Sequence, residues 1–394
     1  MGTTTGTGYS NNSASSAAGR EAAEKAIAGL GGRQVSLAVV FCSTNYDYGE
    51  LLQGVRGVVG TDSIVGCTTA GEFNEQTSGK NSVSVMAIAS DDFLKVIRAA
   101  KGLKGNYENS IRGALGNFKD NQRKMLQQGY GHSTIMVMAD GLAGNGEGMV
   151  DIIQDMAGLS TQIVGGTAGD NGAFDKTYIF AGTQAYNDAI VMVQFFSKKP
   201  FGIGVRHGLS PQTDRMRVTK AEGNILHELD GKPAFEAYKA YAQTKGETLT
   251  DENAGNFMIN NELGIQTMNN TSKIRAPLST NPDGSLNMAT EVPADSQACI
   301  MDGVPSAMLT SVKEAAEEAK QNLQGNNAAG VILFDCICRG IMLDNQFMDE
   351  IKTVSSTLGN VPLAGFETYG EIAKFGGKLT GFHNSTAVVC AIPE

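Results

Sequence analysis

The sequence predicts an α/β protein made of three related β-α-β-α-β-β units with mixed sheets, the third after an insertion. Short apolar runs rich in β-branched residues alternate with amphipathic helical patterns, which is typical of this class. A glycine–acid motif also ends a buried run three times, as TTAGE at 68–72, GTAGD at 166–170 and ETYGE at 367–371. The second interval between these motifs is about twice the first, so we place the insertion at 200–297.

The first unit shows the pattern in full. Its helices are expected at 14–28 and 50–60, and its first buried strand at 35–43. The motif follows in the strand-and-turn segment 63–73, and the apolar run at 82–90 closes the unit. We expect each β-α-β step to be a right-handed crossover between parallel strands, and the last strand to return antiparallel.

The other two units repeat this order. The second is expected to have helices at 107–128 and 148–158 and strands at 133–140 and 161–171. The third is expected to have helices at 309–323 and 348–359 and strands at 329–337, 361–372 and 385–392. A further strand should precede the first helix of every unit, and the candidates are the runs at 3–10, 93–100 and 298–303.

The insertion has a pattern that differs from that of the three units. Its sequence predicts strands, a turn at Asp230-Gly231 and a helix that begins near Pro233. Proline is favoured in the first turn of a helix. Residues 243–272 are polar and rich in Asn and Thr, which predicts a linker or an irregular excursion. We therefore expect an N-terminal domain at 1–242 and a C-terminal domain at 273–394.

The composition excludes several classes of protein. The chain has 41 acidic and 31 basic residues, a formal charge of −10, and no basic run, which argues against a partner that is a nucleic acid or an anionic membrane. No apolar stretch approaches the roughly 18 residues of a membrane helix, and the first residues do not resemble a signal peptide. We expect a cytoplasmic protein whose six cysteines are reduced.

The three glycine–acid turns are candidates for a ligand site. In α/β folds, ligands tend to lie at the carboxyl ends of strands, and glycines there let a ligand approach backbone N–H groups. Threonine hydroxyls would add hydrogen bonds, and an acid could pair with an ammonium group. The alternative is a tight turn whose acid caps local amides. The candidate residues of these turns are Thr68, Thr69, Glu72, Thr167, Asp170, Tyr369 and Glu371.

The segment FDCICRG at 334–340 carries a second set of candidates. A strand that runs into this sequence puts Arg339 at the strand end, where a guanidinium could clamp a carboxylate through two hydrogen bonds. The alternative is a surface arginine beside two core cysteines. Cys-x-Cys without further ligands is a weak metal signal, and a nucleophilic Cys336 would need a nearby histidine that the sequence does not reveal.

The four histidines have no paired spacing typical of a zinc enzyme, so we expect no metal site. Each histidine by itself favours a structural or surface role. His207 and His383 are the better candidates for a cofactor, because both border predicted strands beside glycines.

The chain resembles the FIST family. Two segments resemble a FIST N domain, namely VFCSTNYDYGELLQGVRGVVGTDSIVGCTTAGEF and VTKAEGNILHELDGKPAFEAYKAY. Further segments resemble a FIST C domain, namely IRAPLSTNPDGSLNMATEVPADSQACIMDG, FDCICRG and GFETYGEI with FHNSTAVV. The resemblance extends from about residue 8 to the end. Cys336 and Arg339 match the Cys-x-x-Arg of the family, and Tyr369, Glu371 and His383 match its terminal motifs.

The resemblance implies an intracellular sensory module that binds a small ligand, with amino acids proposed as ligands. Some similar FIST proteins are haem proteins that sense nitric oxide and control a partner histidine kinase. No kinase or DNA-binding module is recognisable in this sequence, so the resemblance implies signal transduction through a separate partner.

Three hypotheses follow. A sensor without catalytic activity would bind an amino acid, with Arg339 or Arg275 for its carboxylate and Glu72, Asp170 or Glu371 for its ammonium. A haem-binding nitric oxide sensor would ligate iron through His207 or His383. An enzyme would use Cys336 or a turn carboxylate, but no nucleophile–base pair is identifiable.

Overall fold

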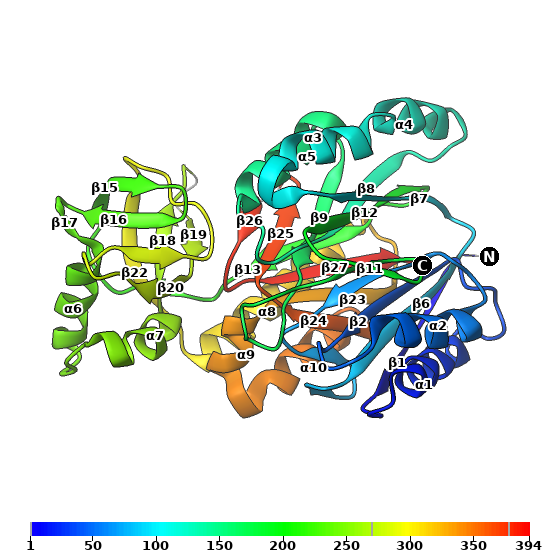
Figure 1. Cartoon of the computed structure of the whole chain (residues 1–394). Coiled ribbons are helices and arrows are strands. Elements are labelled where there is room, and N and C mark those ends of the chain that lie inside the picture. Colours follow the sequence, from blue (N-terminus) through cyan, green and yellow to red (C-terminus); the bar gives the residue numbers. More distant parts are fainter. Residues whose placement is uncertain (1, 269–270, 377–378) are drawn as a thin grey trace.

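The computed structural model describes residues 2–268, 271–376 and 379–394, which form a large body and a smaller lobe (Figure 1). The body contains three six-stranded sheets with the same topology. The first sheet has the order β1 (Thr3–Ser10), β6 (Val83–Ser90), β2 (Leu37–Cys42), β3 (Ile64–Thr68), β10 (Ile179–Ala181) and β11 (Gln184–Tyr186). In it, β2 and β3 are parallel and the other pairs are antiparallel.

The second and third sheets repeat this arrangement around the parallel pairs β8–β9 and β23–β24. The second has the order β7 (Phe93–Lys101), β12 (Ala189–Ser197), β8 (His132–Ala139), β9 (Gln162–Thr167), β25 (Gly370–Lys374) and β26 (Gly381–His383). The third has the order β13 (Gly202–Arg206), β27 (Ala387–Pro393), β23 (Ala328–Cys336), β24 (Leu363–Thr368), β4 (Glu72–Asn74) and β5 (Ser78–Gly79). The predicted α/β class with three repeated units is confirmed.

Each unit places a hairpin in the sheet of another unit. The hairpin β4–β5 of the first unit joins the third sheet, β10–β11 of the second joins the first sheet, and β25–β26 of the third joins the second sheet. The glycine–acid turns precede these hairpins, so all three turns meet. Their backbones form a ring of hydrogen bonds, from Ala70 to Glu367 (3.0 Å), from Tyr369 to Thr167 (3.2 Å) and from Gly169 to Thr68 (3.0 Å).

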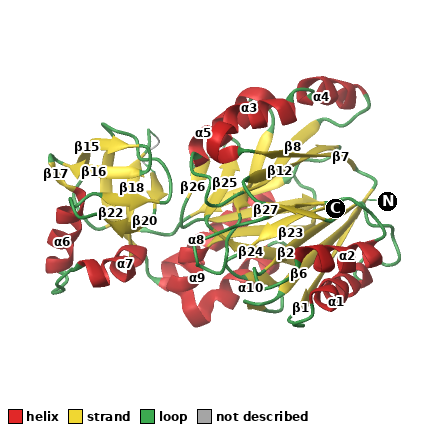
Figure 2. Ribbon diagram, viewed as in Figure 1, coloured by secondary structure: helices red, strands yellow, loops and turns green. Residues whose placement is uncertain are grey.

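Helices cover the outer faces of the three sheets, whose inner faces share one core (Figure 2). Phe41, Phe334 and Phe366 pack against one another within that core, with the ring centroids of Phe41 and Phe366 4.6 Å apart and Phe334 edge-on to Phe366. The helices of the body are α1 (Ser15–Ala28), α2 (Tyr48–Val59), α3 (Leu103–Leu115), α4 (Phe118–Gln127), α5 (Gly146–Ala157), α8 (Pro305–Asn322), α9 (Ile337–Leu343) and α10 (Phe347–Thr357). The predicted helix at 107–128 is thus two helices, α3 and α4.

The prediction of a first strand at 298–303 for the third unit is wrong. That position in the third sheet belongs to β13, which precedes the insertion. A side chain at Gly202 or Gly204 would overlap backbone atoms of α8, just as one at Gly6 or Gly8 of β1 would overlap α1. The same close packing of helix on strand therefore occurs in the first and third units, and residues 298–301 instead lie in a strand of the lobe.

The lobe, on the left in Figure 1, is a sheet of short antiparallel strands with two helices packed against it. Its elements are β14 (Ser210–Pro211), β15 (Met216–Glu222), β16 (Ile225–Leu229), β17 (Lys232–Pro233), α6 (Ala234–Thr244), α7 (Asp251–Asn260), β18 (Asn261–Gln266), β19 (Ser272–Arg275), β20 (Pro277–Thr280), β21 (Leu286–Met288) and β22 (Gln297–Asp302). Much of the segment 243–272, expected to be irregular, therefore forms α7 and β18, because Phe257, Met258 and Leu263 supply apolar contacts to the lobe's own core. Among the described residues, no helix has the length and apolarity needed to span a membrane.

Candidate functional site

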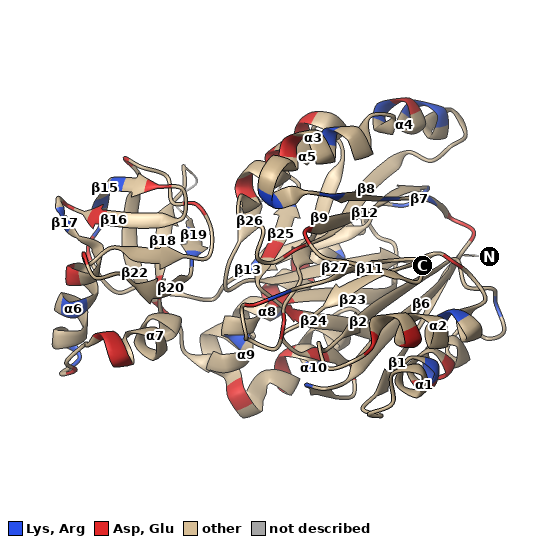
Figure 3. Ribbon diagram, in the orientation of Figure 1, with Lys and Arg blue, Asp and Glu red and all other residues tan. Residues whose placement is uncertain are grey.

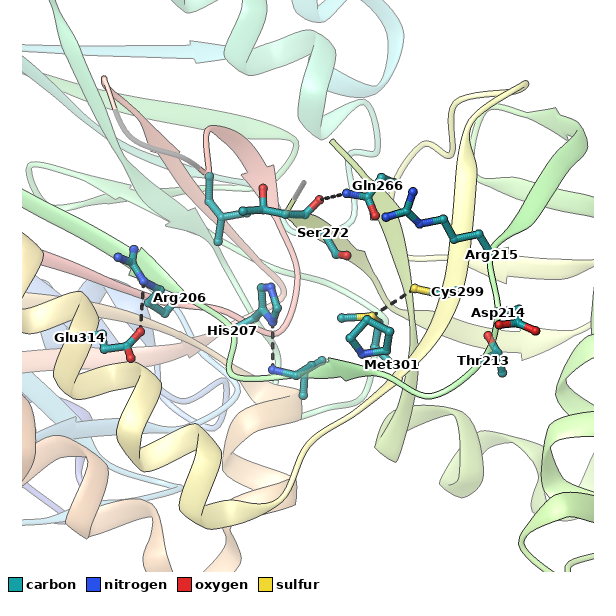
Figure 4. A pocket seen from close by; sticks show the side chains of 14 residues that line it. Arg206, His207, Thr213, Asp214, Arg215, Gln266, Ser272, Cys299, Met301 and Glu314 are labelled. Atoms are coloured by element: carbon teal, nitrogen blue, oxygen red, sulfur yellow. Dashed lines mark hydrogen bonds and ion pairs between the residues drawn. The ribbon is translucent and has the colours of Figure 1, made fainter. Parts of the chain in front are cut away.

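A cavity of about 680 Å³ lies between the body and the lobe (Figure 4). We call it the interlobe cavity. Arg206, His207 and Glu314 line it from the body, and Arg215, Cys299 and Met301 line it from the lobe. Both the body and the lobe therefore contribute to its walls.

The chain itself positions these residues. Strand β13 ends at Arg206, and His207 to Leu209 carry the chain across to the lobe. Gly208, which has a φ of +77°, makes the turn, and a side chain there would overlap α8. This crossing puts His207 at the wall of the cavity, where both parts of the molecule meet.

Charged residues surround the opening of the interlobe cavity. Arg206 is partly buried and pairs with Glu318 at 2.6 Å and with Glu314 at 3.5 Å. Asp214 and Arg215 lie on the lobe side and are exposed. Both signs of charge are therefore available at the rim, in keeping with the interspersed acidic and basic residues of Figure 3.

The floor of the cavity is apolar and contains sulfur. Leu209, Cys299, Met301 and Leu379 are buried, and the Cys299 Sγ lies 3.4 Å from the Met301 Sδ. Burial raises the pKa of the Cys299 thiol, an effect that the charge of Arg215 opposes. Because its pKa is raised, this thiol is protonated at neutral pH and contributes an uncharged surface.

His207 is a neutral hydrogen-bonding residue. Burial lowers its pKa to about 4, helped by the charges of Arg339 and Arg206, while a backbone hydrogen bond with Ser272 acts in the opposite direction. The backbone N–H of Leu209 donates to His207 Nδ1 at 2.9 Å, so the proton of the imidazole resides on Nε2. The ring thus links the body to Ser272 of the lobe.

His207 lacks the hydrogen-bond arrangement of a haem ligand. An iron-ligating nitrogen must be unprotonated, and its partner nitrogen normally donates a hydrogen bond. His207 has the opposite arrangement, since Nδ1 accepts and Nε2 carries the proton. His383 is fully buried, and burial lowers its pKa to about 3, while a backbone hydrogen bond with Ala373 acts in the opposite direction. The described residues also contain no cluster of His, Cys, Asp and Glu suited to a metal ion.

The predicted turn acids are buried and hydrogen-bonded. Glu72 accepts from Ser43 (2.9 Å) and from the backbone of Ser82 (2.9 Å), and burial raises its pKa to about 7. Glu371 accepts from Thr386 at 2.9 Å, and burial raises its pKa to about 8. Both carboxyls act as internal caps in this structure.

The remaining turn residues hold the junction of the three turns. Asp170 accepts from the backbone N–H groups of Phe174, Asp175 and Lys176, all within 2.8 Å. Thr68 and Thr69 are fully buried. Thr167 and Tyr369 are the turn residues that reach the wall of a cavity, a smaller one beside the 141–146 loop.

The two arginines expected to clamp a carboxylate are engaged elsewhere. Arg339 is fully buried and pairs with Glu350 (3.0 Å) and Asp335 (3.1 Å), and it donates to the His207 carbonyl at 2.7 Å. Arg275 is 2% exposed and pairs with Glu147 at 2.6 Å. Arg339 therefore positions His207, and Arg275 joins the lobe to α5. Neither arginine lines the interlobe cavity.

The cysteine pair lies under the lobe. Cys336 is 2% exposed, and burial raises its pKa well above the usual range. The pKa of Cys338 is lowered, first by a hydrogen bond from Cys336 and further by hydrogen bonds with Ser385 and Glu262. Glu262 belongs to β18 of the lobe and was not foreseen, because an isolated glutamate in the insertion has no sequence pattern that marks it as buried.

Two family models cover most of the chain. The FIST N domain matches residues 36–232 and the FIST C domain matches residues 234–374. The chain belongs to the FIST family. FIST domains are small-ligand sensing domains in signal transduction.

This FIST protein is similar to several proteins that are named as uncharacterized. It is 28% identical over 198 residues to the uncharacterized protein MJ1623 of Methanocaldococcus jannaschii, which covers 48% of this chain and 37% of that protein. It is 26% identical over 240 residues to the uncharacterized protein Mb0898c of Mycobacterium bovis, with coverage of 58% and 60%. The uncharacterized protein Rv0628c of Mycobacterium tuberculosis is 26% identical over 237 residues, with coverage of 58% and 61%. The matched region thus spans less than two thirds of each of these relatives.

Proposed function

We propose that this FIST protein senses a small carboxylate-bearing ligand, an amino acid with an apolar side chain, in the interlobe cavity. The observation that carries this proposal is the distribution of chemistry in the cavity, with charges of both signs at the rim and an apolar floor. A zwitterion with an apolar tail matches such a distribution, since ligand cavities combine apolar walls with a few polar groups that orient the ligand.

Named residues supply each part of the recognition. Arg215 and Arg206 provide guanidinium groups for a carboxylate, the group that arginine binds through paired hydrogen bonds. Asp214 and Glu314 provide carboxylates for an ammonium group. His207 offers a neutral Nε2–H that a ligand can share with the Ser272 backbone. Met301, with the other floor residues, contacts the apolar side chain.

The signal arises because the ligand contacts both parts of the molecule. A ligand that touches both the body and the lobe stabilises the arrangement in which those contacts are best. We infer that the output is this change of lobe position, read by a separate partner protein in the cytoplasm. A histidine kinase is the partner class that the family resemblance suggests. The free, buried state of all six cysteines supports a reducing compartment.

Calorimetric titration of the purified chain with single amino acids tests the proposal. We expect saturable binding of one or more apolar amino acids, and a loss of at least about tenfold in affinity for Arg215→Ala, as expected for a hydrogen-bonded charge. Arg217→Ala is the matched control, because Arg217 pairs with Asp295 on the exposed side of the lobe and does not line the cavity. Equal affinity of the Arg215→Ala variant would remove the interlobe cavity as the site.

A further inference from the structure

Next to the small cavity beside the 141–146 loop lies a larger one of about 410 Å³, where the glycine-rich loop 141–145 faces the lobe. The loop, Phe174 and Tyr369 line it from the body. Asn224, Leu278, Met288 and Glu291 line it from the lobe. None of these residues lines the interlobe cavity, so the two cavities are separate. We call this one the aromatic cavity.

Two stacked rings form one wall of the aromatic cavity. The rings of Phe174 and Tyr369 are 4.4 Å apart and inclined by 12°. Phe174 remains 47% exposed although it is a large apolar residue. Its φ of +53° is unfavourable for a bulky residue, and Asp170 stabilises this conformation by accepting from the Phe174 N–H at 2.8 Å. The ring is thus held against Tyr369 with much of its surface uncovered.

The wall carries negative charge without a positive counterpart. Among the described residues that line this cavity, Glu291 is the charged one, and the others are apolar or neutral. Arg275 donates to the Glu291 backbone carbonyl at 2.9 Å, but its guanidinium forms its ion pair with Glu147. The Glu291 carboxylate itself accepts from the hydroxyl of Thr290. An aromatic ring and a carboxylate therefore face one space.

We propose that the aromatic cavity binds a small organic cation, such as an alkylammonium or quaternary ammonium compound. A cation is attracted to the face of an aromatic ring, and this attraction grows when water is excluded. Glu291 adds a direct charge interaction, while Leu278 and Met288 contact the alkyl groups. This site does not depend on the carboxylate ligand proposed for the interlobe cavity.

A charged ligand and its neutral isostere make the first test. Choline and 3,3-dimethylbutan-1-ol have nearly the same shape and differ in the charge of the central atom. We expect saturable calorimetric binding of choline to the full chain and weaker binding of the alcohol, by about 2- to 30-fold for the cation–π contact alone. Equal binding of the two compounds, or no saturation by choline at millimolar concentration, would overturn the proposal.

Variants locate the site. Phe174→Leu keeps an apolar side chain but removes the ring, so choline affinity should fall by about 2- to 30-fold while affinity for the alcohol is retained. Phe174→Tyr should bind choline as the native chain does, and Glu291→Gln should weaken choline binding. Glu228→Gln, a lobe glutamate outside both cavities, is the control. Native affinity in the Phe174→Leu variant, or loss of choline binding in Arg215→Ala, would contradict the assignment.

Discussion

Two buried glutamates and one partly buried glutamate keep their protons near neutral pH. Burial raises the pKa values of Glu72 and Glu367 to about 7 and that of Glu371 to about 8, from the ordinary value of 4.5. At pH values between about 4.5 and about 8, the folded chain therefore holds protons that the unfolded chain has released. Stability falls with rising pH wherever the native state binds more protons. The free energy of unfolding should thus decrease as pH rises from about 4.5 to about 8.

Glu371→Gln should make this pH dependence shallower by about one proton, because glutamine stays neutral at every pH in the range. Urea denaturation at several pH values between about 5 and 8 measures the slope. Glu247→Gln, at an exposed position, should leave the slope unchanged. A native slope in the Glu371→Gln variant would mean that this carboxyl does not hold a proton in the folded state.

Arg339 should matter for stability. Its guanidinium lies between two buried carboxylates, Asp335 and Glu350, and all three side chains are fully buried. Arg339→Met should lower the free energy of unfolding by about 3–5 kcal/mol, since it leaves two buried acids without their cation. Denaturant unfolding measures this loss, with Arg217→Met as the surface control. An effect below about 1 kcal/mol would contradict the internal role of this arginine.

At the scale of single elements, close packing of helix on strand sets the outline of each unit. Gly204→Ala in β13 would place a side-chain carbon against the Ala315 carbonyl of α8. We expect a loss of about 1–3 kcal/mol or more, since overpacking forces the backbone to move. Gly57→Ala on α2 meets no neighbouring atom and should instead stabilise the chain by up to about 1 kcal/mol. Thermal denaturation of the two variants should show shifts of opposite sign.

The strongly periodic elements could be predicted from the sequence, and others could not. The strands expected at 35–43, 133–140 and 329–337 coincide within two residues with β2, β8 and β23, because their apolar runs are long and buried on both faces. Strand β13 was missed although its Gly-x-Gly spacing repeats that of β1. The exchanged hairpins have strands of two to five residues, too short for any periodicity to reveal their partners.

The candidate site was only partly predictable, because tertiary packing brings some of its residues together. His207 borders a glycine at a strand end, and this signal led to a residue that lines the interlobe cavity. Arg215, Cys299 and Met301 lie in the lobe, which has no counterpart in the repeated units. Their proximity results from tertiary packing of β15 and β22, which local sequence does not encode.

At the scale of the whole molecule, partly buried ion pairs join the body and the lobe. Glu147 of α5 bonds both Lys273 and Arg275 of β19, and Arg275 is 2% exposed. Glu147→Gln leaves Arg275, which is buried, and Lys273, which is partly buried, without their charge partner, so the lobe should move away from the body. Small-angle X-ray scattering should show a larger radius of gyration, and a ligand of the interlobe cavity should reverse the change. Glu236→Gln, in an exposed pair within the lobe, should leave the radius unchanged.

The exchange of hairpins has a consequence for synthesis of the chain. The first sheet lacks its last strands until residue 186 has been made, and the second lacks its own until residue 383. The third sheet is completed by β27, which pairs with both β13 and β23 and ends at Pro393. On the ribosome, therefore, the first two sheets stay incomplete until strands of a later unit have been made, and the body can close only after β27 has been made.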